Sequence, residues 1–205
     1  MPKIQAATVA EHRARQRRAI LDAARAIIAE GRPEAPSLAA VAARTGLARP
    51  SIYQYFRSSA DLLEAVIVDM FPRWSAYVAQ RMRRAASPGE RVFAYVAANL
   101  HLVAQGEHAI VRGLAATAPA ELLAERSREL HEQLRVPLLE ALAEHGAPDP
   151  AGTAELIQAI VYRASRMIED GTGEAKARAL ARELLEPYLR QPVTPASGSR
   201  STRGA

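Results

Sequence analysis

The residues that decide the fold are 37–56, which read SLAAVAARTGLARPSIYQYF. Ser37 is a favourable N-cap for a short helix, Gly46 lies in the turn Thr-Gly-Leu, and Pro50 suits the first turn of a second short helix. Apolar side chains at helical spacing would pack across the turn and set the angle between the helices; these are Leu38, Val41, Ala42, Leu47 and Ile52. The stretch therefore predicts a helix-turn-helix.

The outward side of the second short helix is polar. Its residues are Arg49, Pro50, Ser51, Tyr53, Gln54 and Tyr55. Arginine and hydroxyl groups hold DNA phosphates, and a side-chain amide can read a base edge, adenine best. The pattern favours this face as a DNA-binding surface.

The stretch resembles the N-terminal domain of TetR-type (tetracycline-repressor-like) transcriptional regulators. The shared features are the cap at Ser37, the turn at Gly46, the sequence Tyr-Gln-Tyr-Phe at 53–56, and helical patterns over 20–28 and from Leu62 onward. The resemblance covers roughly residues 12–68, about a third of the chain. It implies an all-α fold, sequence-specific DNA binding and transcription regulation rather than an enzymatic activity.

The resemblance also assigns roles to individual positions. Ser37 would bond a phosphate at the start of its helix. Arg49, Pro50, Ser51 and Gln54 would face the major groove, while Tyr53 and Tyr55 would donate their hydroxyls to the DNA backbone. Phe56 would belong to the core. Four arginines ahead of or within the first helix would contact phosphates or a minor groove, namely Arg13, Arg15, Arg17 and Arg18.

Two positions depart from the family pattern. Ser59 stands where the family commonly has lysine near the start of the fourth helix, so a phosphate contact is lost or moves, for example to Arg57. Pro50 stands where Gly, Ala or Ser is frequent. Because proline has no backbone N–H, recognition at Pro50 would rely on apolar contact such as a thymine methyl.

Helical spacing continues along nearly the whole chain. Alanine is abundant and aromatic residues make up only 5%, which favours helices over strands. Thr8 and Glu11 predict the start of the first helix, Ser58 or Ser59 the start of a long helix kinked or broken at Pro72, and Ser87 a further start. Later helices are expected over 108–116, 119–145 with a bend at Pro137, 150–169 and up to 189. The sequence predicts an all-α protein of about nine helices.

The chain divides into four parts on this basis. We expect a flexible N-terminal arm at 1–10, a helix-turn-helix DNA-binding domain at 11–58, a helical ligand-binding and dimerisation domain at 59–190, and a disordered tail at 191–205. Charge follows the same division: residues 1–60 hold 10 Lys+Arg against 4 Asp+Glu, whereas 61–189 hold 14 against 18. A basic N-terminal end on an acidic body is typical of a protein that binds a polyanion.

The C-terminal helices offer two predictions. Leu156, Ile157, Ile160, Val161, Ala164 and Met167 would face inward on one helix, and Leu180, Leu184 and Tyr188 would share one side of the last. The resemblance implies that helices at about 152–169 and 173–189 pair with their copies in a homodimer, although the same stripes fit an internal core. Candidate lining for a ligand pocket is Trp74, Tyr77, Phe93, Asn99 and Arg112, which fit plain core packing equally well.

Several function classes are excluded or disfavoured. The absence of cysteine excludes a disulfide scaffold and a thiol nucleophile, and the five histidines lack metal-ligand spacing, so we expect no metal and no cofactor. The uncharged stretch 93–106 is too short and polar to span a bilayer, and no secretory signal is visible, which favours the cytoplasm.

The sequence thus predicts a homodimeric DNA-binding transcriptional regulator that represses its genes and responds to an unknown small-molecule effector. Two alternatives stay open: a ligand-independent DNA-organising protein, and a helical enzyme, for which no paired acid and base is apparent.

Overall fold

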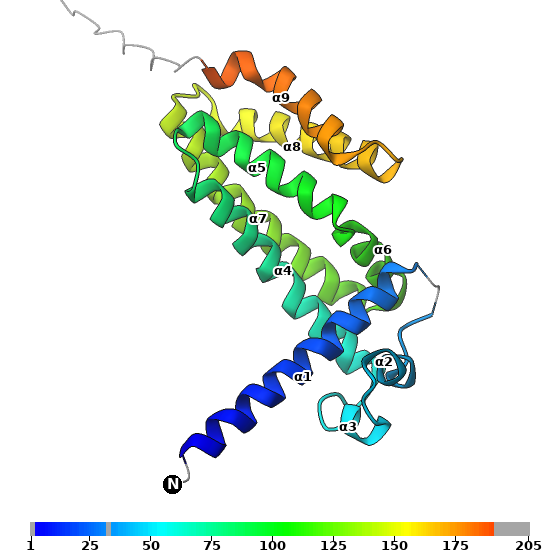
Figure 1. The fold of residues 1–205 in the computed structure, drawn as a ribbon. Helices are drawn as coiled ribbons and strands as arrows, with labels where there is room; N and C mark the ends of the chain where they lie inside the picture. The colour runs from blue at the N-terminus through cyan, green and yellow to red at the C-terminus, as the bar shows by residue number, and fades with distance from the viewer. Residues whose placement is uncertain (1–2, 32–33, 191–205) are drawn as a thin grey trace, which may run out of the picture. The chain divides into compact units, whose positions relative to one another are not determined.

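The computed structural model describes residues 3–31 and 34–190, and over these ranges the protein consists of nine α-helices without a strand. The predicted all-α fold is confirmed; the tail predicted at 191–205 lies outside the described residues. The helices, labelled in Figure 1, are α1 (Lys3–Ala29), α2 (Leu38–Thr45), α3 (Arg49–Tyr53), α4 (Ser59–Arg83), α5 (Pro88–Ala104), α6 (Glu107–Thr117), α7 (Ala120–His145), α8 (Pro150–Glu169) and α9 (Glu174–Arg190).

Four helix starts follow from capping side chains. The Ser37 hydroxyl accepts a hydrogen bond from the Ala40 N–H at 3.1 Å, and Ser58 and Ser87 accept in the same way at the starts of α4 and α5. The Asp149 carboxylate accepts from the Gly152 N–H at 3.0 Å ahead of α8. These contacts satisfy N–H groups that have no partner within the helix, which is why the predicted starts hold.

Two predicted features of the helices are wrong, and a third prediction is settled in part. α1 begins at Lys3, so Thr8 does not cap it and residues 3–10 are helical; this stretch is rich in alanine and contains no proline or glycine. α3 ends at Tyr53, so Gln54 and Tyr55, which were expected on its outward side, follow the helix. Pro72 lies inside α4, which continues past it, so of the kink and the break predicted there the break does not occur.

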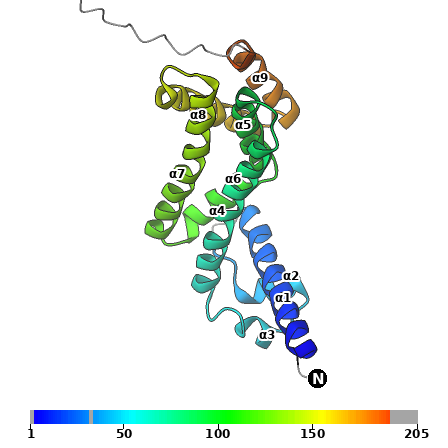
Figure 2. The same cartoon turned by 90° about the vertical axis from the view of Figure 1, so that its left-hand side faces the viewer.

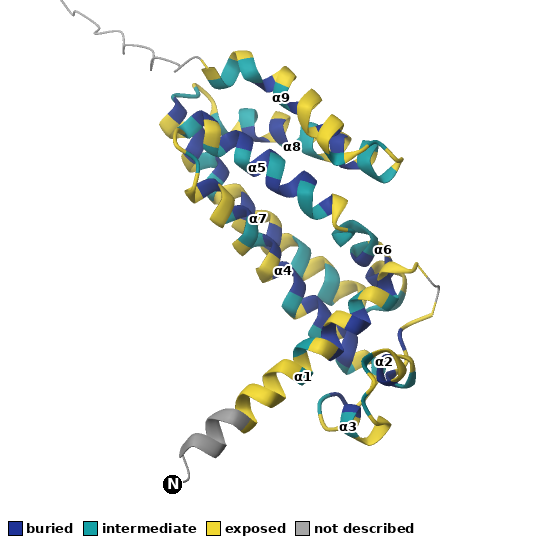
Figure 3. Ribbon diagram, in the orientation of Figure 1, coloured by how far each residue is buried: buried dark blue, intermediate teal, exposed yellow. Residues whose placement is uncertain are grey.

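The first compact unit comprises Met1–Trp74 and Gln105–Leu130. Within it α1 packs against α2 and α6, and α2 packs against α3, as Figure 2 shows from a second direction. Residues 9–15 of α1 are exposed, whereas its second half buries Ile20, Leu21 and Ile28 (Figure 3). Gly113 of α6 lies so close to α1 that an added Cβ would stand 2.7 Å from the Ile28 carbonyl oxygen.

The second compact unit comprises Ser75–Ala104 and the chain from His131 onward. Its central helix is α5, which packs against both α8 and α9 and buries most of its length (Figures 1 and 3). The predicted inward stripe of α8 is only partly correct, because Ile157 and Ala164 are buried but Leu156 is 70% exposed. Leu184 of α9 is 71% exposed. None of the described helices combines the length and apolar character needed to cross a membrane.

Candidate nucleic-acid interface

The turn between α2 and α3 is held by local geometry. Gly46 caps α2 with φ of 71°, a left-handed conformation that glycine adopts without the steric cost of a Cβ. The Thr45 hydroxyl donates to the Val41 carbonyl at 2.9 Å, and Ile52 and Phe56 are buried behind α3. One side of α3 is therefore fixed against the core, which leaves its other side toward solvent.

The outward side of α3 has the composition that the sequence indicated. Arg49, Pro50 and Gln54 are exposed, Tyr53 is 59% exposed, and Ser51 is half-buried. This surface presents one guanidinium, one amide and one phenol that can contact a groove or a phosphate.

Tyr55 is placed differently from Tyr53. Its hydroxyl donates to Gln16 Oε1 of α1 at 2.6 Å, and the Arg13 guanidinium lies over its ring, 5.8 Å from the centroid. Arg17 lies in the same way over the Phe56 ring at 5.7 Å. These contacts bring the exposed arginines of α1 beside the segment that follows α3, as a single basic surface.

The remaining residues that were predicted to contact DNA are also exposed. Ser37 is exposed at the start of α2, where its hydroxyl oxygen accepts the capping bond and its proton can still be donated. The side chain of Arg57 is exposed, and its backbone N–H donates to the Asp61 carboxylate at 2.9 Å. Arg15 is also exposed on α1.

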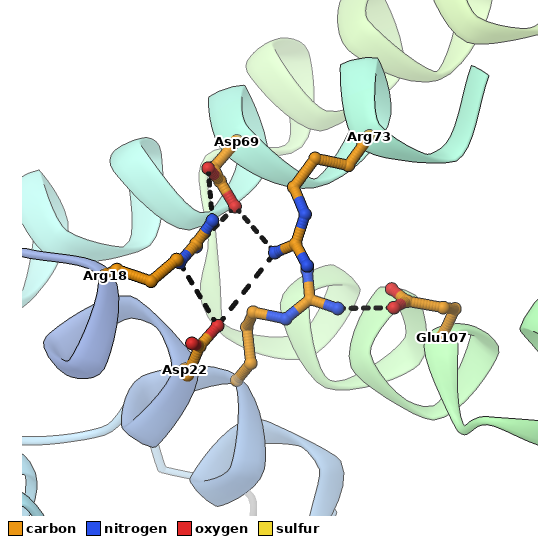
Figure 4. A network of polar contacts seen from close by, with 6 residues as sticks. Arg18, Asp22, Asp69, Arg73 and Glu107 are labelled. Carbon is orange, nitrogen blue, oxygen red and sulfur yellow. Dashed lines mark hydrogen bonds and ion pairs between the residues drawn. The ribbon is translucent and has the colours of Figure 1, made fainter. Parts of the chain in front are cut away.

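Arg18 was predicted to contact DNA, but its guanidinium pairs with carboxylates of the protein itself. Its guanidinium donates two hydrogen bonds to Asp69 of α4, at 3.0 and 2.7 Å, and it also pairs with Asp22 (Figure 4). The Asp69 bond raises the pKa of Arg18. Burial raises the pKa of Asp69, but its hydrogen bonds to Arg18 and Arg73 outweigh this effect, and its pKa lies below the ordinary value. Arg18 therefore joins α1 to α4.

A second ion pair in the same unit joins α1 to α6. The Arg25 guanidinium donates to the Glu107 carboxylate in the first turn of α6 (Figure 4), and their side chains are only 12% and 16% exposed. Together with the close contact of Gly113 on Ile28, this pair fixes α6 on α1 within the unit.

The five predicted pocket residues divide between the two units. Trp74 is buried and stacks on His108, and Arg112 is exposed, both in the first unit. In the second unit, Tyr77 stacks on His101, Phe93 is buried under the Arg182 guanidinium, and the Asn99 amide donates to the Tyr95 carbonyl at 2.9 Å. Phe93 also lines a surface pocket of the second unit, of about 300 Å³.

The sequence did not predict a role for Gln16, Asp69 or Glu107. Gln16 carries no local signal, because its partner Tyr55 lies 39 positions away. The pairs Arg18–Asp69 and Arg25–Glu107 span 51 and 82 positions. Two ion pairs of this network have the four-residue spacing that a sequence pattern can show, Arg18–Asp22 and Asp69–Arg73.

Comparison with known proteins agrees with this geometry. The family model described as "Bacterial regulatory proteins, tetR family" matches residues 20–66. No curated protein matches the chain in sequence. The described helices superpose on solved structures of transcriptional regulators at low sequence identity, as follows.

Three of these structures illustrate the likeness. A TetR/AcrR-family regulator from Thermobifida fusca is 22% identical, with 86% of this chain and 99% of that chain covered and a TM-score of 0.59. FadR from Bacillus subtilis, solved with stearoyl-CoA, is 19% identical, with 86% and 98% covered and a TM-score of 0.60. AibR, solved with isovaleryl coenzyme A and operator DNA, is 20% identical, with 82% and 96% covered and a TM-score of 0.62.

The match at residues 20–66 covers the helix-turn-helix of α2 and α3. The described chain has the fold of these regulators. The chain therefore carries, at residues 20–66, the DNA-binding domain of the TetR family of transcriptional regulators.

Proposed function

We propose that the protein is a cytoplasmic, ligand-responsive repressor that binds its operator as a homodimer. The observation that carries the proposal is the outward side of α3, where Arg49, Tyr53 and Gln54 are exposed while Ile52 behind them is fully buried. A helix anchored on one side and polar on the other is suited to enter a major groove.

The roles at this surface follow from the contacts. Gln54 reads a base edge, and Arg49 and Tyr53 bind a base or phosphate; Pro50 and Ser51 lie at the start of α3, where it enters the groove. Ser37, Arg57, Arg13 and Arg17 contact phosphates around it. Tyr55 acts through Gln16, by holding α1 against the segment that follows α3.

Dimerisation uses α8 and α9. Exposed apolar side chains on these helices support this proposal; they are Leu156, Tyr162, Leu180 and Leu184. Large apolar side chains that stay in water in one chain gain free energy when a second copy covers them. A dimer presents two copies of α3, which must match major grooves about one DNA turn apart, roughly 34–36 Å.

In this proposal the effector binds within residues 59–190, and residues 11–58 bind DNA. The ion pairs of Arg18 and Arg25 support a coupling of the two activities, because they join α1 to α4 and α6 within the first unit. A ligand that prefers one arrangement of α4 or α6 then changes the population of DNA-binding dimers by its differential affinity. That solved relatives of this fold hold acyl-CoA molecules supports the presence of an effector.

Fluorescence anisotropy with duplexes tiling the DNA around the protein's own gene tests the proposal. We expect one duplex to bind at least about tenfold more tightly than the others, and Gln54→Ala to abolish that preference. Gln80→Ala is the matched control, because Gln80 is an exposed glutamine of α4 that does not belong to the helix-turn-helix.

Two results would count against the proposal. In the first, the wild type and both variants bind every duplex weakly and equally, with an affinity that falls steeply as salt is added. That result would indicate attraction to phosphates alone, as in a DNA-organising protein. Equal loss of preference in the Gln54 and Gln80 variants would show that the outward side of α3 does not read the sequence.

A further inference from the structure

One side of α1 faces the segment that follows α3. Gln16 accepts a hydrogen bond from the Tyr55 hydroxyl at 2.6 Å. The Arg13 guanidinium lies over the Tyr55 ring, 5.8 Å from its centroid, and the Arg17 guanidinium lies over the Phe56 ring at 5.7 Å. Because residues three and four apart share one side of a helix, these three positions define a single side of α1, which we call its basic side (Arg13, Gln16 and Arg17).

The charges of α1 are divided between its sides. Arg18 and Arg25 form ion pairs with carboxylates of α4 and α6. Arg13 and Arg17 are exposed, and neither forms an ion pair with a carboxylate among the side chains that the structure describes. Glu11 lies two residues before Arg13, which places it on the opposite side of the helix. The basic side of α1 therefore presents two cations to solvent with no acidic residue between them.

Stacking on the rings orients the two guanidinium groups and leaves their donors available. A guanidinium group that lies over an aromatic ring keeps its N–H groups in its own plane, where an oxygen acceptor can reach them. A long exposed side chain normally loses conformational freedom when it binds, and a side chain that is already oriented loses less. Arg13 and Arg17 are thus oriented to bind anionic oxygen atoms.

The spacing of the two arginines fits a particular arrangement of anions. Four residues of an α-helix span about 6 Å along its axis. Neighbouring phosphates of one DNA strand have a similar separation along the backbone. Val9 lies one turn further toward the N-terminus on the same side, and this uncharged side chain is 60% exposed. The basic side therefore fits two successive phosphates, followed by an apolar group such as a sugar.

We propose that α1 runs along one DNA strand beside the groove that α3 enters, with Arg13 and Arg17 on successive phosphates and Val9 against the adjoining sugar. Residues 9–15 are helical and exposed, so the protein itself leaves this stretch open to DNA. Arg15, on the opposite side of α1, takes no part. Each chain then contacts DNA beyond the base pairs that α3 reads. The inference rests on the proposed function only for the position of α3; the contact of α1 with phosphates is a separate claim.

The salt dependence of binding tests the contact with a duplex of any sequence. Each phosphate contact contributes about 0.9 to the slope of log affinity against log salt concentration. We expect Arg13→Gln and Arg17→Gln each to reduce this slope by about 0.9 per bound chain in fluorescence anisotropy. Arg15→Gln is the matched control, because it removes the same charge from an exposed position on the other side of α1. An equal reduction in the Arg13 and Arg15 variants would overturn the proposal.

Ethylation of single phosphates locates the contacts on the duplex that the protein prefers. We expect ethylation of two neighbouring phosphates on one strand of each half-site to weaken binding of the wild type. It should have no further effect on a variant that carries both Arg13→Gln and Arg17→Gln. These phosphates should lie outside the base pairs whose replacement weakens binding of the wild type but not of Gln54→Ala. Phosphates on opposite strands, or separated along one strand, would overturn the placement of α1.

Lysine variants separate the charge of the two arginines from their packing. Arg13→Lys and Arg17→Lys keep the charge but lose the planar group that stacks on Tyr55 and Phe56. We expect both variants to keep the salt slope of the wild type. A slope that falls as far as in the glutamine variants would overturn the proposal, because the arginines would then act by holding α1 in place and not by binding phosphates.

The inference and the proposed function fail in different ways. If no duplex is preferred, but Arg13→Gln reduces the salt slope and Arg15→Gln does not, the contact of α1 with phosphates stands and sequence-specific repression fails. If one duplex is preferred and Gln54→Ala abolishes the preference, the proposed function stands. Equal slopes for the Arg13 and Arg15 variants on that duplex would then show that α1 does not follow a DNA strand.

Discussion

Two tyrosines separated by a single residue have different environments. The Tyr55 hydroxyl donates to Gln16, whereas Tyr53 is 59% exposed. We predict that Tyr55→Phe lowers the free energy of unfolding by about 1 kcal/mol, the usual contribution of one hydrogen bond, and that Tyr53→Phe leaves it unchanged. Urea denaturation of both variants measures the difference.

Operator binding should show the opposite order. Tyr53→Phe removes a hydroxyl that can reach a phosphate, so it should weaken binding more than Tyr55→Phe does. If Tyr55→Phe weakens operator binding without lowering stability, the Tyr55 hydroxyl of the wild type leaves Gln16 when the operator binds and contacts DNA directly.

Asp69 makes stability depend on pH. The hydrogen bonds from Arg18 and Arg73 hold its pKa below the ordinary 3.8 in the folded protein, so it stabilises the fold above about pH 4 and loses this effect as pH falls through the folded pKa. We predict that Asp69→Asn lowers the free energy of unfolding by about 2 kcal/mol at pH 7. Denaturation at several pH values should show the gap closing as the pH falls below about 4.

Asp22 is the control for this prediction. It contacts the same two arginines but is 54% exposed, and exposed ion pairs contribute about 0.2–1 kcal/mol. An Asp22→Asn variant that loses as much stability as Asp69→Asn would show that burial of Asp69 is not the cause.

At the scale of helices, the sequence predicted starts better than ends. Ser37, Ser58 and Asp149 cap their helices through bonds to the N–H three residues on, so the signal is local and readable. The end of α3 at Tyr53 was missed, because Phe56 turns into the core after the helix and this depends on packing. The start of α1 was placed too late, because alanine propensity continued the helix without a cap.

The contact between α1 and α6 depends on a glycine. A Cβ added to Gly113 would lie 2.5 Å from Ile28 Cγ2 and 2.7 Å from the Ile28 carbonyl oxygen, so the two helices would have to move apart. We predict that Gly113→Ala lowers the free energy of unfolding by about 1–3 kcal/mol despite the better helix propensity of alanine. Thermal denaturation followed by circular dichroism measures this change.

Gly173→Ala is the matched substitution, because a Cβ there would meet no atom within 4 Å. It should change stability by less than about 0.5 kcal/mol. A stabilised Gly113→Ala protein would mean that α1 and α6 are not in close contact in solution.

At the scale of the whole molecule, the two functional regions were predictable to different degrees. The outward side of α3 follows from periodicity within twenty residues, so Arg49, Tyr53 and Gln54 were identified from sequence and are exposed in the structure. The ligand region was not, because Trp74, Phe93 and Asn99 look alike in sequence whether they line a pocket or fill a core, and all three are buried.

In the proposed function, operator recognition depends on the assembly of two chains. Leu184 is 71% exposed on α9, four residues after Leu180, which is 39% exposed, so the two lie on one side of that helix. We predict that Leu184→Lys shifts the protein from dimer to monomer in multi-angle light scattering, because two lysines would face each other across the two-fold axis. Operator affinity should fall at least about tenfold, since one chain contacts only one half-site.

Val136→Lys is the control, because Val136 is an exposed apolar residue of α7, at 49%, outside α8 and α9. This variant should remain dimeric and bind operator normally, with the same helical content as the wild type. The reverse result, a monomeric Val136→Lys protein beside a dimeric Leu184→Lys protein, would place the interface on α7. In that case the exposed side chains of α8 and α9 would need another partner, and α3 of the two chains would be spaced by a different pair of helices.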